Sequence, residues 1–496
     1  MKEIFTKSET MSQEYCATFV KLEDIQDIPN AKTVSKALVN GREIVISKNC
    51  KVGDIMVYCS NETQLNADFC YMNNLYSDIN RNSNCDEVLE WLSQNVDATE
   101  EEKHDYTIKH RGYFDVNRRI RMIKLAGTYS MGFLIEPEAF TKWCPSLKFT
   151  KEDLESLVGT DFDTVNGELF IKAYVPVKQQ AQTYNHNRSD RRNKHLKRFD
   201  RMIPGQFAFH YDTTPFEKTI SRFDPDMKVS ISVKLHGTSY IIGNVLVKKP
   251  KYGGLYTKVF PYLPSWLQFT KNDYDTIYSS RSVIKNSDIN PHKKGFSKGL
   301  DACFDKYYEL LKDYIPQNIT IYGEIVGYCE DTNSYIQSMG KGYDYKCCPG
   351  KNQLMIYRVT ENLKDGTHRE YEVDEVVNFT RNFKHELEKQ NSLAAERIIE
   401  LPILYQGTLR DLYPDLDVNN HWHEEFLERI KYDKEHFGME ELEPLCRNKV
   451  PREGIVFRIF NDPVKEAFKL KCVKFLRKEA EDIDNGHVDS EIEERY

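Results

Sequence analysis

Long apolar runs are missing from this sequence, and their absence excludes several classes of protein. No stretch approaches the roughly 20 apolar residues that a membrane-spanning helix needs. The start of the chain also lacks the apolar core of a secretion signal. No heptad pattern is present, so we expect a monomer. Because no membrane-spanning segment is present, we expect no membrane partner. The expected location is the cytoplasm, or the host cytoplasm if a phage encodes the protein.

Cysteine pairs with metal-binding spacing are also missing. The chain has 12 cysteines, but none forms a Cys-x-x-Cys pair. The adjacent Cys347 and Cys348 are too few for a zinc site. We therefore expect reduced thiols, most of them packed inside the protein.

An excess of positive charge is missing as well. The 69 lysines and arginines are outnumbered by 77 acidic residues, which gives a net charge of −8. This balance excludes a chain coated in positive charge, but it leaves room for a local patch that binds phosphates. Residues 186–201 contain such a cluster, formed by Arg188, Arg191, Arg192, Lys194, Lys197, Arg198 and Arg201. The cluster is either a solvated linker between domains or a basic strap across an RNA backbone.

Short strand patterns separated by turn signals dominate the first part of the chain. They cover residues 15–21, 42–47, 54–60 and 120–135, and they favour a small OB-like β-barrel. Residues 82–112 are polar and predict loop and helix inserted between barrel strands. In residues 119–122, alternation places Arg119 and Arg121 on one face of a strand, either facing RNA phosphate or simply exposed.

One segment carries more chemical information than any other. Residues 229–239 read Val-Ser-Ile-Ser-Val-Lys-Leu-His-Gly-Thr-Ser, an alternating strand that ends in a glycine turn. Its period of two places Val229, Ile231, Val233 and Leu235 on one face, and Ser232, Lys234 and His236 on the other. A lysine amine on such a rigid element becomes a nucleophile when desolvation or nearby cations lower its pKa. The alternative is an ordinary surface lysine on an edge strand.

Further motifs follow this lysine in a fixed order. They are Tyr-Ser-Ser-Arg-Ser (278–282), Ile-Tyr-Gly-Glu-Ile-Val-Gly (321–327), Met-Ile-Tyr-Arg-Val (355–359), Arg-Glu-Gly-Ile-Val (452–456) and Phe-Lys-Leu-Lys (468–471). With Lys-Leu-His-Gly (234–237), they resemble motifs I, Ia, III, IIIa, IV and V of the covalent nucleotidyltransferases, the ATP-dependent ligases and capping enzymes. Each motif alone is common by chance, so the resemblance depends on their shared order.

Two features make the resemblance closest to RNA ligases. Histidine in the third place of motif I, followed by Thr-Ser-Tyr, resembles phage nick-sealing and editing-type RNA ligases, whereas DNA ligases usually have aspartate there. The long segment before the lysine also resembles the RNA ligase family with an N-terminal OB domain and a C-terminal catalytic domain, known from bacteria and protists. In DNA ligases and capping enzymes the OB module usually follows the catalytic domain.

The resemblance implies an α+β protein with a defined order of parts. Residues 1–175 would form the OB-like RNA-binding domain, and residues 176–205 a basic linker. Residues 206–480 would form a two-sheet nucleotidyltransferase domain (ATP-grasp-like ligase) with surface helices, two of them indicated by apolar periodicity at 376–388 and 420–435. Residues 481–496 would form an acidic, frayed tail.

The resemblance also implies a reaction and roles for individual residues. Lys234 would attack the α-phosphate of ATP to form lysyl-AMP, AMP would pass to an RNA 5′-phosphate, and a 3′-OH would displace it. Lys469 and Lys471 share a strand face and would reach the α-phosphate, with Gly237 in the nucleotide-binding turn. The remaining roles are Arg281 on a phosphate or the ribose, Glu324 on the ribose or a metal-bound water, and Glu453 on Mg²⁺ or Mn²⁺.

Several points stay open at this stage. His236 cannot anchor a hydrated metal ion as aspartate does, and would contact the 5′-phosphate instead. Met355 and Tyr357 share one strand face, and the sequence does not decide which of them, if either, stacks on adenine. The segments His-Tyr-Asp-Thr (210–213) and Gly-Tyr-Asp-Tyr (342–345) also resemble the family, without an assigned step. The expected partners are RNA ends and an end-healing kinase or phosphatase. The competing interpretations are a DNA ligase or capping guanylyltransferase on the same core, and an RNA-binding protein without catalysis.

Overall fold

The computed structural model describes residues 3–9, 11–175, 201–260, 263, 265–286, 298–339, 341–363, 366–418, 422–462 and 465–485. The chain divides into two compact units, Met1–Tyr174 and Val175–Tyr496, and each is described by itself. Apart from Arg201, the predicted basic cluster at 186–201 lies outside the described residues. Within these ranges, no helix is both long enough and apolar enough to cross a membrane.

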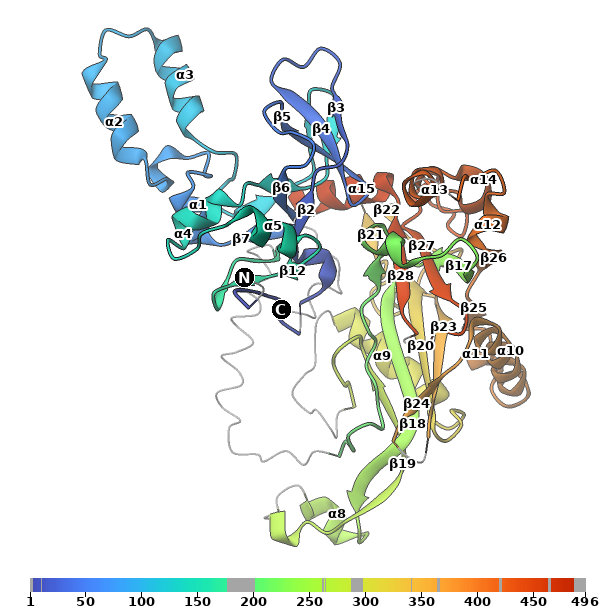
Figure 1. Ribbon diagram of the computed structural model, residues 1–496. Coiled ribbons are helices and arrows are strands. Elements are labelled where there is room, and N and C mark those ends of the chain that lie inside the picture. The colour runs from blue at the N-terminus through green and yellow to red at the C-terminus, as the bar shows by residue number, and fades with distance from the viewer. Residues whose placement is uncertain are drawn as a thin grey trace. The chain divides into compact units, whose positions relative to one another are not determined.

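The first unit consists of short strands and helices (Figure 1). Its strands are β1 (Phe5–Thr6), β2 (Ala17–Lys21), β3 (Ile25–Asp27), β4 (Val34–Val39), β5 (Arg42–Ser47), β6 (Ile55–Cys59), β7 (Thr63–Leu65), β8 (Arg119–Ile120), β9 (Ile123–Leu125), β10 (Thr128–Ser130), β11 (Phe133–Ile135), β12 (Asp161–Phe162), β13 (Thr164–Val165), β14 (Glu168–Leu169) and β15 (Ile171–Ala173). Its helices are α1 (Ala67–Met72), α2 (Cys85–Gln94), α3 (Glu100–His110), α4 (Glu138–Trp143) and α5 (Lys151–Leu157).

These strands pair into several small sheets. Their orders are β11-β6-β2-β12, β15-β7-β8, β3-β4-β5, β1-β13-β14 and β10-β9. The pairing among the described residues does not close into a barrel, so the predicted OB-like barrel is not confirmed. The strands expected from the sequence at 42–47 and within 15–21 and 54–60 are present. Phenylalanines dominate the core of this unit, including Phe19, Phe69 and Phe162.

The polar insertion at 82–112 forms helices, as its composition indicated. Thr99 and Glu102 form a reciprocal capping box at the start of α3, which satisfies backbone N–H groups that the first helical turn leaves without partners. The rings of Trp91 on α2 and Tyr106 on α3 stack with their centroids 3.8 Å apart. This stack ties the two helices together.

The second unit contains longer strands and larger sheets. Its strands are β16 (Thr214–Pro215), β17 (Lys228–Lys234), β18 (Thr238–Pro250), β19 (Thr270–Ser279), β20 (Ile319–Gly327), β21 (Ser338–Met339), β22 (Lys341–Gly342), β23 (Asn352–Asn362), β24 (His368–Glu370), β25 (Ile398–Glu400), β26 (Ile403–Thr408), β27 (Gly454–Ile459) and β28 (Ala467–Lys471). Its helices are α7 (Phe216–Thr219), α8 (Leu255–Val259), α9 (Lys298–Leu311), α10 (Val373–Gln390), α11 (Ser392–Ala395), α12 (Leu409–Leu412), α13 (Trp422–Lys431), α14 (Lys434–Phe437) and α15 (Val473–Asp484).

Two sheets organise this unit. The β17 sheet has the strand order β16-β28-β27-β17-β26, and the β18 sheet has the order β19-β18-β20-β23-β24, with β25 beside β23. The chain passes from one sheet to the other at residues 398–408, because β25 pairs with β23 and the following strand, β26, pairs with β17. The expected two-sheet organisation of this part is therefore present.

The alternating pattern of β17 determines which of its faces is buried. Val229, Ile231, Val233 and Leu235 all belong to one apolar cluster, as their period-two spacing predicted. Helix α13 contributes Phe426, Leu427 and Ile430 to the same cluster. One face of the β17 sheet is thus closed by helices, and the polar side chains of the strand point the other way.

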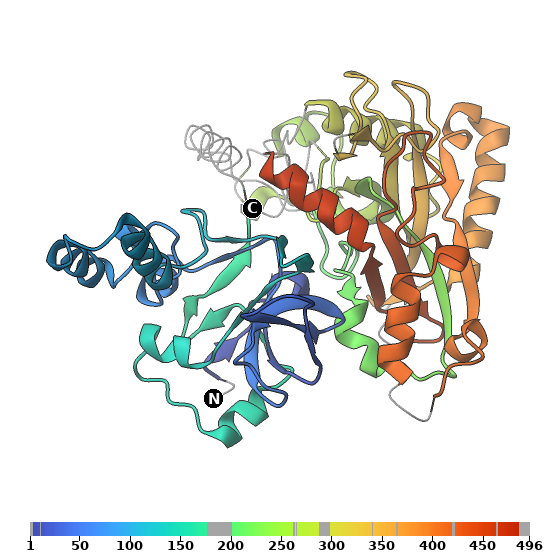
Figure 2. The same ribbon diagram turned by 90° about the horizontal axis from the view of Figure 1, so that it is seen from above.

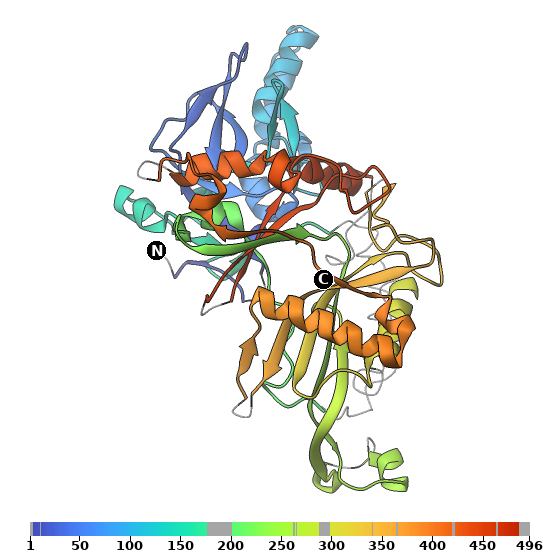
Figure 3. The same cartoon turned by 90° about the vertical axis from the view of Figure 1, so that its right-hand side faces the viewer.

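The β18 sheet is covered by helices α9 and α10 (Figure 3). Helix α10 begins with a capping box between Glu372 and Glu375, and it buries Val376, Phe383 and Leu387 at helical spacing against the sheet. The helices predicted at 376–388 and 420–435 are therefore confirmed as elements that pack on sheets.

Two elements of this unit differ from the sequence-based expectation or extend it. Residues 481–484 belong to helix α15, which follows β28 (red in Figure 2) and buries Ala480 and Ile483, so the expectation of a frayed tail is wrong for them. Residues 486–496 lie outside the described residues. Strands β18 and β19 form a long hairpin that extends beyond the neighbouring strands and carries α8 near its tip (Figures 1 and 3).

Candidate active site

Residues from both sheets of the second unit line one cleft. Its volume is about 630 Å³, part of it open to solvent. The lining residues are His210, Thr213, Ser232, Val233, Lys234, Leu235, Arg281, Glu324, Tyr357, Leu401, Val456, Arg458 and Ala467. Lys234, Arg281 and Glu324 were all predicted from sequence as site residues, so the fold brings three separate motifs to one place.

Lys234 is the last residue of β17 and stands next to a carboxylate. Its Nζ lies 2.6 Å from Oε1 of Glu453. The lysine side chain is 21% exposed and that of Glu453 is 4% exposed. The amine therefore lies at the boundary between solvent and interior, with its partner held inside.

Glu453 is fixed by the close approach of two strands. A Cβ at the next residue, Gly454, would lie 2.0 Å from the carbonyl oxygen of Leu470 on β28. Only glycine fits there. The second carboxylate oxygen, Oε2, is buried without a hydrogen bond from any described residue, and Nδ1 of His236 lies 3.6 Å from it. A buried carboxylate oxygen in this state has capacity for a further donor or a cation.

The strand register places Lys469 and Lys471 on the same sheet face as Lys234. In the β17 sheet, Lys234 pairs with Gly454, which pairs with Lys471. One step along, Ser232 pairs with Val456, which pairs with Lys469. Directly paired residues point to the same face, so the three lysines share it.

The intervening residue Leu470 points to the opposite face and belongs to the apolar cluster, as the sequence predicted. Lys471 donates to Oε1 of Glu479 on α15 at 3.1 Å.

Glu324 and Gly237 meet where β20 passes the turn after Lys234. A Cβ at Gly237 would lie 2.4 Å from the carbonyl oxygen of Ile325 and 2.8 Å from Cγ of Glu324. The turn therefore needs glycine to lie this close to β20. Gln337 donates from Nε2 to the carbonyl oxygen of Gly237 at 2.8 Å, which holds the turn in place.

Arg281 lies two residues beyond the end of β19 and forms an ion pair with Asp212. Asp212 belongs to the segment 210–213, which the sequence had marked without assigning a step. Its neighbours His210 and Thr213 line the cleft. Burial, with the charges of Arg281 and Arg358 next in size, lowers the pKa of His210 well below its usual value. This imidazole is therefore neutral at neutral pH.

His236 is enclosed by aromatic side chains. Its ring meets the ring of Tyr343 at 4.7 Å and that of Phe475 at 5.1 Å, both edge to face. Its backbone N–H donates to Oη of Tyr345 at 2.7 Å. Tyr343 and Tyr345 of the segment 342–345 thus pack against the motif I turn at His236. The contact of His236 with a 5′-phosphate stays a prediction, and its neighbour in the structure is Glu453.

A β-bulge in β23 determines which of the side chains of Met355 and Tyr357 faces the cleft. Tyr322 of β20 pairs with Arg358 and Gly323 pairs with Ile356, which leaves Tyr357 as the extra residue of β23. Such a bulge redirects a side chain. Tyr357 lines the cleft, whereas Met355 belongs to the apolar cluster behind the β17 sheet. Of the two residues, Tyr357 is therefore the one that faces the cleft.

Arg458 is a cleft residue that the sequence analysis did not single out. It lies on β27 two residues after Val456, on the same face, and both line the cleft. Alternation along the motif IV strand was the signal that could have found it. With Lys234 and Arg281, it brings the lining cations to three, against the single acidic lining residue Glu324.

Arg119 and Arg121 belong to the first unit and have protein partners. Arg119 is buried and donates from Nε and Nη2 to the two carboxylate oxygens of Glu62, at 2.7 and 2.9 Å. Arg121 lies outside the two-residue strand β8 and pairs with Asp115 at 3.0 Å. The expected strand with an open arginine face is therefore wrong, because Arg119 is held in a buried ion pair.

A protein-only metal cage is not part of this site. Among the described residues, no group of three or more histidine, cysteine or acidic side chains could hold an ion. Mg²⁺ usually keeps several waters and binds through one or two carboxylates together with substrate phosphates. The buried oxygen of Glu453 and the carboxylate of Glu324, which lines the cleft, are each suited to that mode of binding.

Comparisons with known proteins give matches at the level of structure only. No protein-family model and no curated protein matches the chain. Among solved structures, an apo mutant of an RNA ligase from Naegleria gruberi has 17% sequence identity and a TM-score of 0.47, and the match covers 95% of this chain and 100% of that one. The same ligase with PPi has 16% identity and a TM-score of 0.47, covering 94% and 99%. A further mutant with ATP and Mn has 16% identity and a TM-score of 0.48, covering 95% and 99%. A similarity of this size does not assign a function.

Proposed function

We propose that this protein is an ATP- and divalent-metal-dependent RNA ligase that joins a 3′-OH to a 5′-phosphate through lysyl-AMP and an adenylylated RNA 5′ end. The observation that carries the proposal is the position of Lys234. Its amine ends a rigid strand at the edge of a cationic cleft, next to a buried carboxylate and on the same sheet face as Lys469 and Lys471.

The first step would be attack by Lys234 on the α-phosphate of ATP. The amine must first lose a proton, and Oε1 of Glu453 is an acceptor at 2.6 Å. A nitrogen–phosphorus bond then forms while the bond to pyrophosphate breaks, so negative charge spreads over the phosphate oxygens. Fixed cations aimed at those oxygens stabilise that charge without reorganisation. Arg281 and Arg458 line the cleft for this purpose.

The same groups would serve the later steps. In the second step the RNA 5′-phosphate would attack the α-phosphorus of lysyl-AMP and release the lysine amine. In the third step the RNA 3′-OH would attack the phosphorus of the RNA 5′-phosphate, and AMP would leave together with the α-phosphate. Lys469 and Lys471 share the lysine's face of the sheet and would stay within reach of that phosphate. A divalent cation held by Glu453, with Glu324 as a second carboxylate, would neutralise further charge when bound. Tyr357 would stack on the adenine.

RNA is proposed as the substrate because of the sequence resemblance. The His-Gly-Thr-Ser turn after Lys234 and the long segment before it both resemble RNA ligases rather than DNA ligases or capping enzymes. A capping enzyme on the same core would take label from GTP instead of ATP. A DNA ligase would seal nicks that have a DNA 3′-OH strand.

Labelling with α-phosphate-labelled ATP tests the proposal directly. Wild-type protein should retain label that withstands alkali and is released by acid, as expected for a phosphoramidate, and mass spectrometry should find an AMP adduct on the peptide that contains Lys234. The variant Lys234→Ala should take no label. Lys228→Ala is the matched control, because Lys228 lies on the same strand but is exposed at its start.

Label that survives in Lys234→Ala would refute the nucleophile. Label from GTP alone, or sealing that requires a DNA 3′-OH, would replace RNA ligase with one of the related enzymes. Salt-sensitive RNA binding without adenylate formation at any metal or nucleotide would favour a non-catalytic RNA-binding protein.

A further inference from the structure

The hairpin of β18 and β19 carries a concentration of positive charge that the proposed reaction does not use. We call residues 248–271, at the outer end of this hairpin, the arm. The arm has no acidic residue and five lysines, Lys248, Lys249, Lys251, Lys258 and Lys271, in a chain whose net charge is −8. The sequence analysis did not single out this segment.

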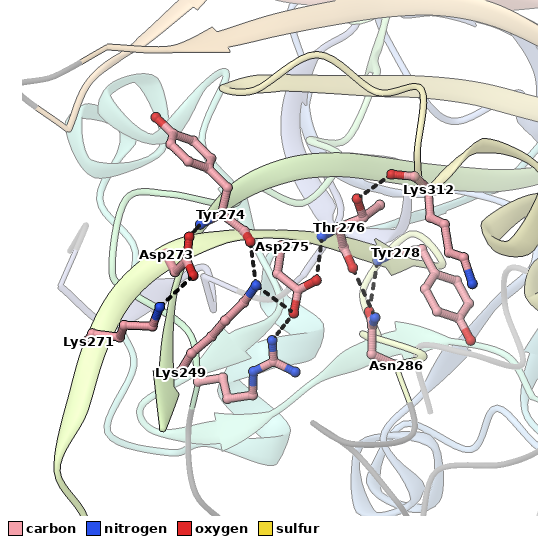
Figure 4. Close-up of polar contacts among 10 residues, drawn as sticks. Lys249, Lys271, Asp273, Tyr274, Asp275, Thr276, Tyr278, Asn286 and Lys312 are labelled. Atoms are coloured by element: carbon pink, nitrogen blue, oxygen red, sulfur yellow. Dashed lines mark hydrogen bonds and ion pairs between the residues drawn. The ribbon is translucent and has the colours of Figure 1, made fainter. Parts of the chain in front are cut away.

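Carboxylates of β19 at the base of the arm neutralise part of this charge (Figure 4). Lys271 pairs with Asp273 at 3.1 Å, and Lys249 donates to the carbonyl oxygen of Tyr274 and lies 3.9 Å from Asp275. Lys251 lies nearer the tip and Lys248 nearer the cleft, and neither forms an ion pair with any described residue. Lys248 and Lys251 therefore carry positive charge that is not compensated, one on each side of the paired Lys249 along the chain.

The tip of the arm exposes large apolar side chains. Trp266 is 73% exposed, Tyr252 is 52% exposed and Phe269 is 49% exposed. The loop that bears them is held by Tyr256, whose Oη donates to the carbonyl oxygen of Leu267 and accepts from the N–H of Phe269, both at 2.7 Å. Exposed aromatic rings among uncompensated cations form the stacking and electrostatic surface that binds single-stranded nucleic acid.

The arm is connected to the cleft through regular structure. Strand β18 begins at Thr238, directly after the turn that follows Lys234, and β19 ends two residues before Arg281. The pairing of the two strands is continuous from Ile241–Ser279 to Pro250–Thr270. The 13 residues of β18 span roughly 43 Å at about 3.3 Å per residue. A stacked nucleic-acid strand that advances about 3.4 Å per nucleotide covers this length in roughly a dozen nucleotides.

We propose that the arm binds a single-stranded RNA segment about a dozen nucleotides from the ends that meet in the cleft. Trp266 and Tyr252 stack on unpaired bases, and Lys248 and Lys251 contact the phosphates. This inference rests on the proposed function for its substrate. A lipid surface is the alternative occupant for exposed aromatics with lysines, but the ribbon that joins the tip to Lys234 and Arg281 favours a ligand that also enters the cleft.

Binding of single-stranded RNA of two lengths tests the arm. For a 24-nucleotide RNA, Trp266→Ala should weaken binding about fivefold or more, because loss of one base–aromatic stack has about that effect. For an 8-nucleotide RNA, too short to reach the arm from the cleft, it should change nothing. Tyr432→Ala is the matched control, since Tyr432 is a 55% exposed aromatic residue elsewhere in the same unit. Equal binding of the long RNA by wild type and Trp266→Ala would overturn the inference.

A second variant removes the outer part of the arm, residues 251–269, and keeps the paired residues of β18 and β19. Because Pro250 pairs directly with Thr270, residues 251–269 can be replaced by Asn-Gly, which closes a two-residue hairpin. This variant should lose the length-dependent part of RNA binding and keep labelling by ATP at Lys234. Length-dependent binding that persists in it would contradict the inference.

The same experiments separate the arm from the proposed function. Wild-type protein that takes label from ATP but binds RNA independently of the arm would sink this inference and leave the ligase proposal intact. Arm-dependent RNA binding by a protein that takes no label from ATP would support the inference about the arm and refute the ligase proposal. Binding to vesicles of anionic phospholipid that is lost in Trp266→Ala, with RNA binding unchanged, would assign the arm to membranes and overturn its RNA role.

Discussion

Each unit contains a buried carboxylate paired with a cation, and the two pairs differ in how completely they are satisfied. In the first unit, Arg119 binds both oxygens of Glu62, and the two side chains are 3% and 7% exposed. In the second unit, Lys234 binds one oxygen of Glu453, and the lysine is 21% exposed. The other oxygen of Glu453 is buried without a hydrogen bond from any described residue.

The difference separates a structural pair from a reactive one. A bidentate arginine–carboxylate pair inside a protein leaves little capacity for a further ligand. A lysine that touches solvent, beside a carboxylate with an oxygen to spare, can lose its proton and accept a phosphate. The comparison predicts that breaking the first pair affects stability and that breaking the second affects chemistry.

The largest expected effect is loss of stability in Arg119→Met. The substitution leaves the carboxylate of Glu62 buried without its cation, which costs about 3–5 kcal/mol in comparable pairs. Guanidinium denaturation of the full chain should show this loss, and the double variant Arg119→Met/Glu62→Leu should recover most of it. Labelling of Lys234 in the folded protein should not change. A loss below about 1 kcal/mol would mean that the pair is not the structural element described.

The next largest effect is expected on the rate of lysine labelling in the variant Glu453→Gln. The amide keeps the shape of the side chain but removes the charge that accepts the lysine proton and attracts a cation. We expect lysine labelling to slow about a hundredfold, which corresponds to about 2.7 kcal/mol. Stability should change little, because the Lys234 head group has access to water. Glu155→Gln, which alters a surface pair with Lys21, is the control and should leave labelling intact. An unchanged rate in Glu453→Gln would refute the role of Glu453.

A smaller effect tests the close approach of β27 and β28. In Gly454→Ala the new Cβ meets the carbonyl oxygen of Leu470, so the two strands must separate. Overpacking of this kind costs about 1–3 kcal/mol, and it should slow labelling by moving Lys469 and Lys471 relative to Lys234. Gly253→Ala is the control, because a Cβ at Gly253 meets nothing within 4 Å. Equal stability and labelling of the two variants would contradict the packing argument.

The smallest effect is a dependence of stability on pH that arises at His210. The folded state holds the pKa of this histidine well below its usual value. Below pH 6.5 the unfolded chain therefore binds a proton that the folded chain does not bind, and stability falls as pH falls, by at most about 1.4 kcal/mol per unit. Denaturation between pH 7 and 5 should show a shallower loss for His210→Gln.

The control for this experiment is His385→Gln, because the side chain of His385 is 67% exposed. That variant should keep the wild-type slope. A wild-type slope in His210→Gln as well would place the acid-sensitive group elsewhere.

Sequence patterns predicted the strands of the second unit better than those of the first, for a physical reason. A strand such as β17, buried on one face, must alternate strictly, so the faces of Val233 and Lys234 could be read from the sequence. In the first unit the strands have few residues, and β8 has two. A pattern that short cannot distinguish Arg119 in a buried pair from Arg119 on an open face.

Other features of the site depend on contacts between distant segments. The bulge that redirects Tyr357 comes from the register between β20 and β23, which local periodicity does not encode. The aromatic enclosure of His236 joins Tyr343 and Phe475 to the motif I turn across more than 100 positions of sequence. The acidic sequence after β28 forms helix α15, which packs on the core, and Lys471 of β28 pairs with Glu479 of this helix.

The strand order of the β17 sheet has a consequence for synthesis of the protein on the ribosome. Lys234 emerges early, but its neighbours β27 and β28 end at residues 459 and 471, and β16 pairs in parallel with β28. At 5–20 residues per second, the interval is roughly 10–50 s. If Lys234 is the nucleophile that we propose, the nascent chain has its amine during that time but not yet the cations of β27 and β28. Under this proposal, a translation product that stops within this interval would not take label from ATP.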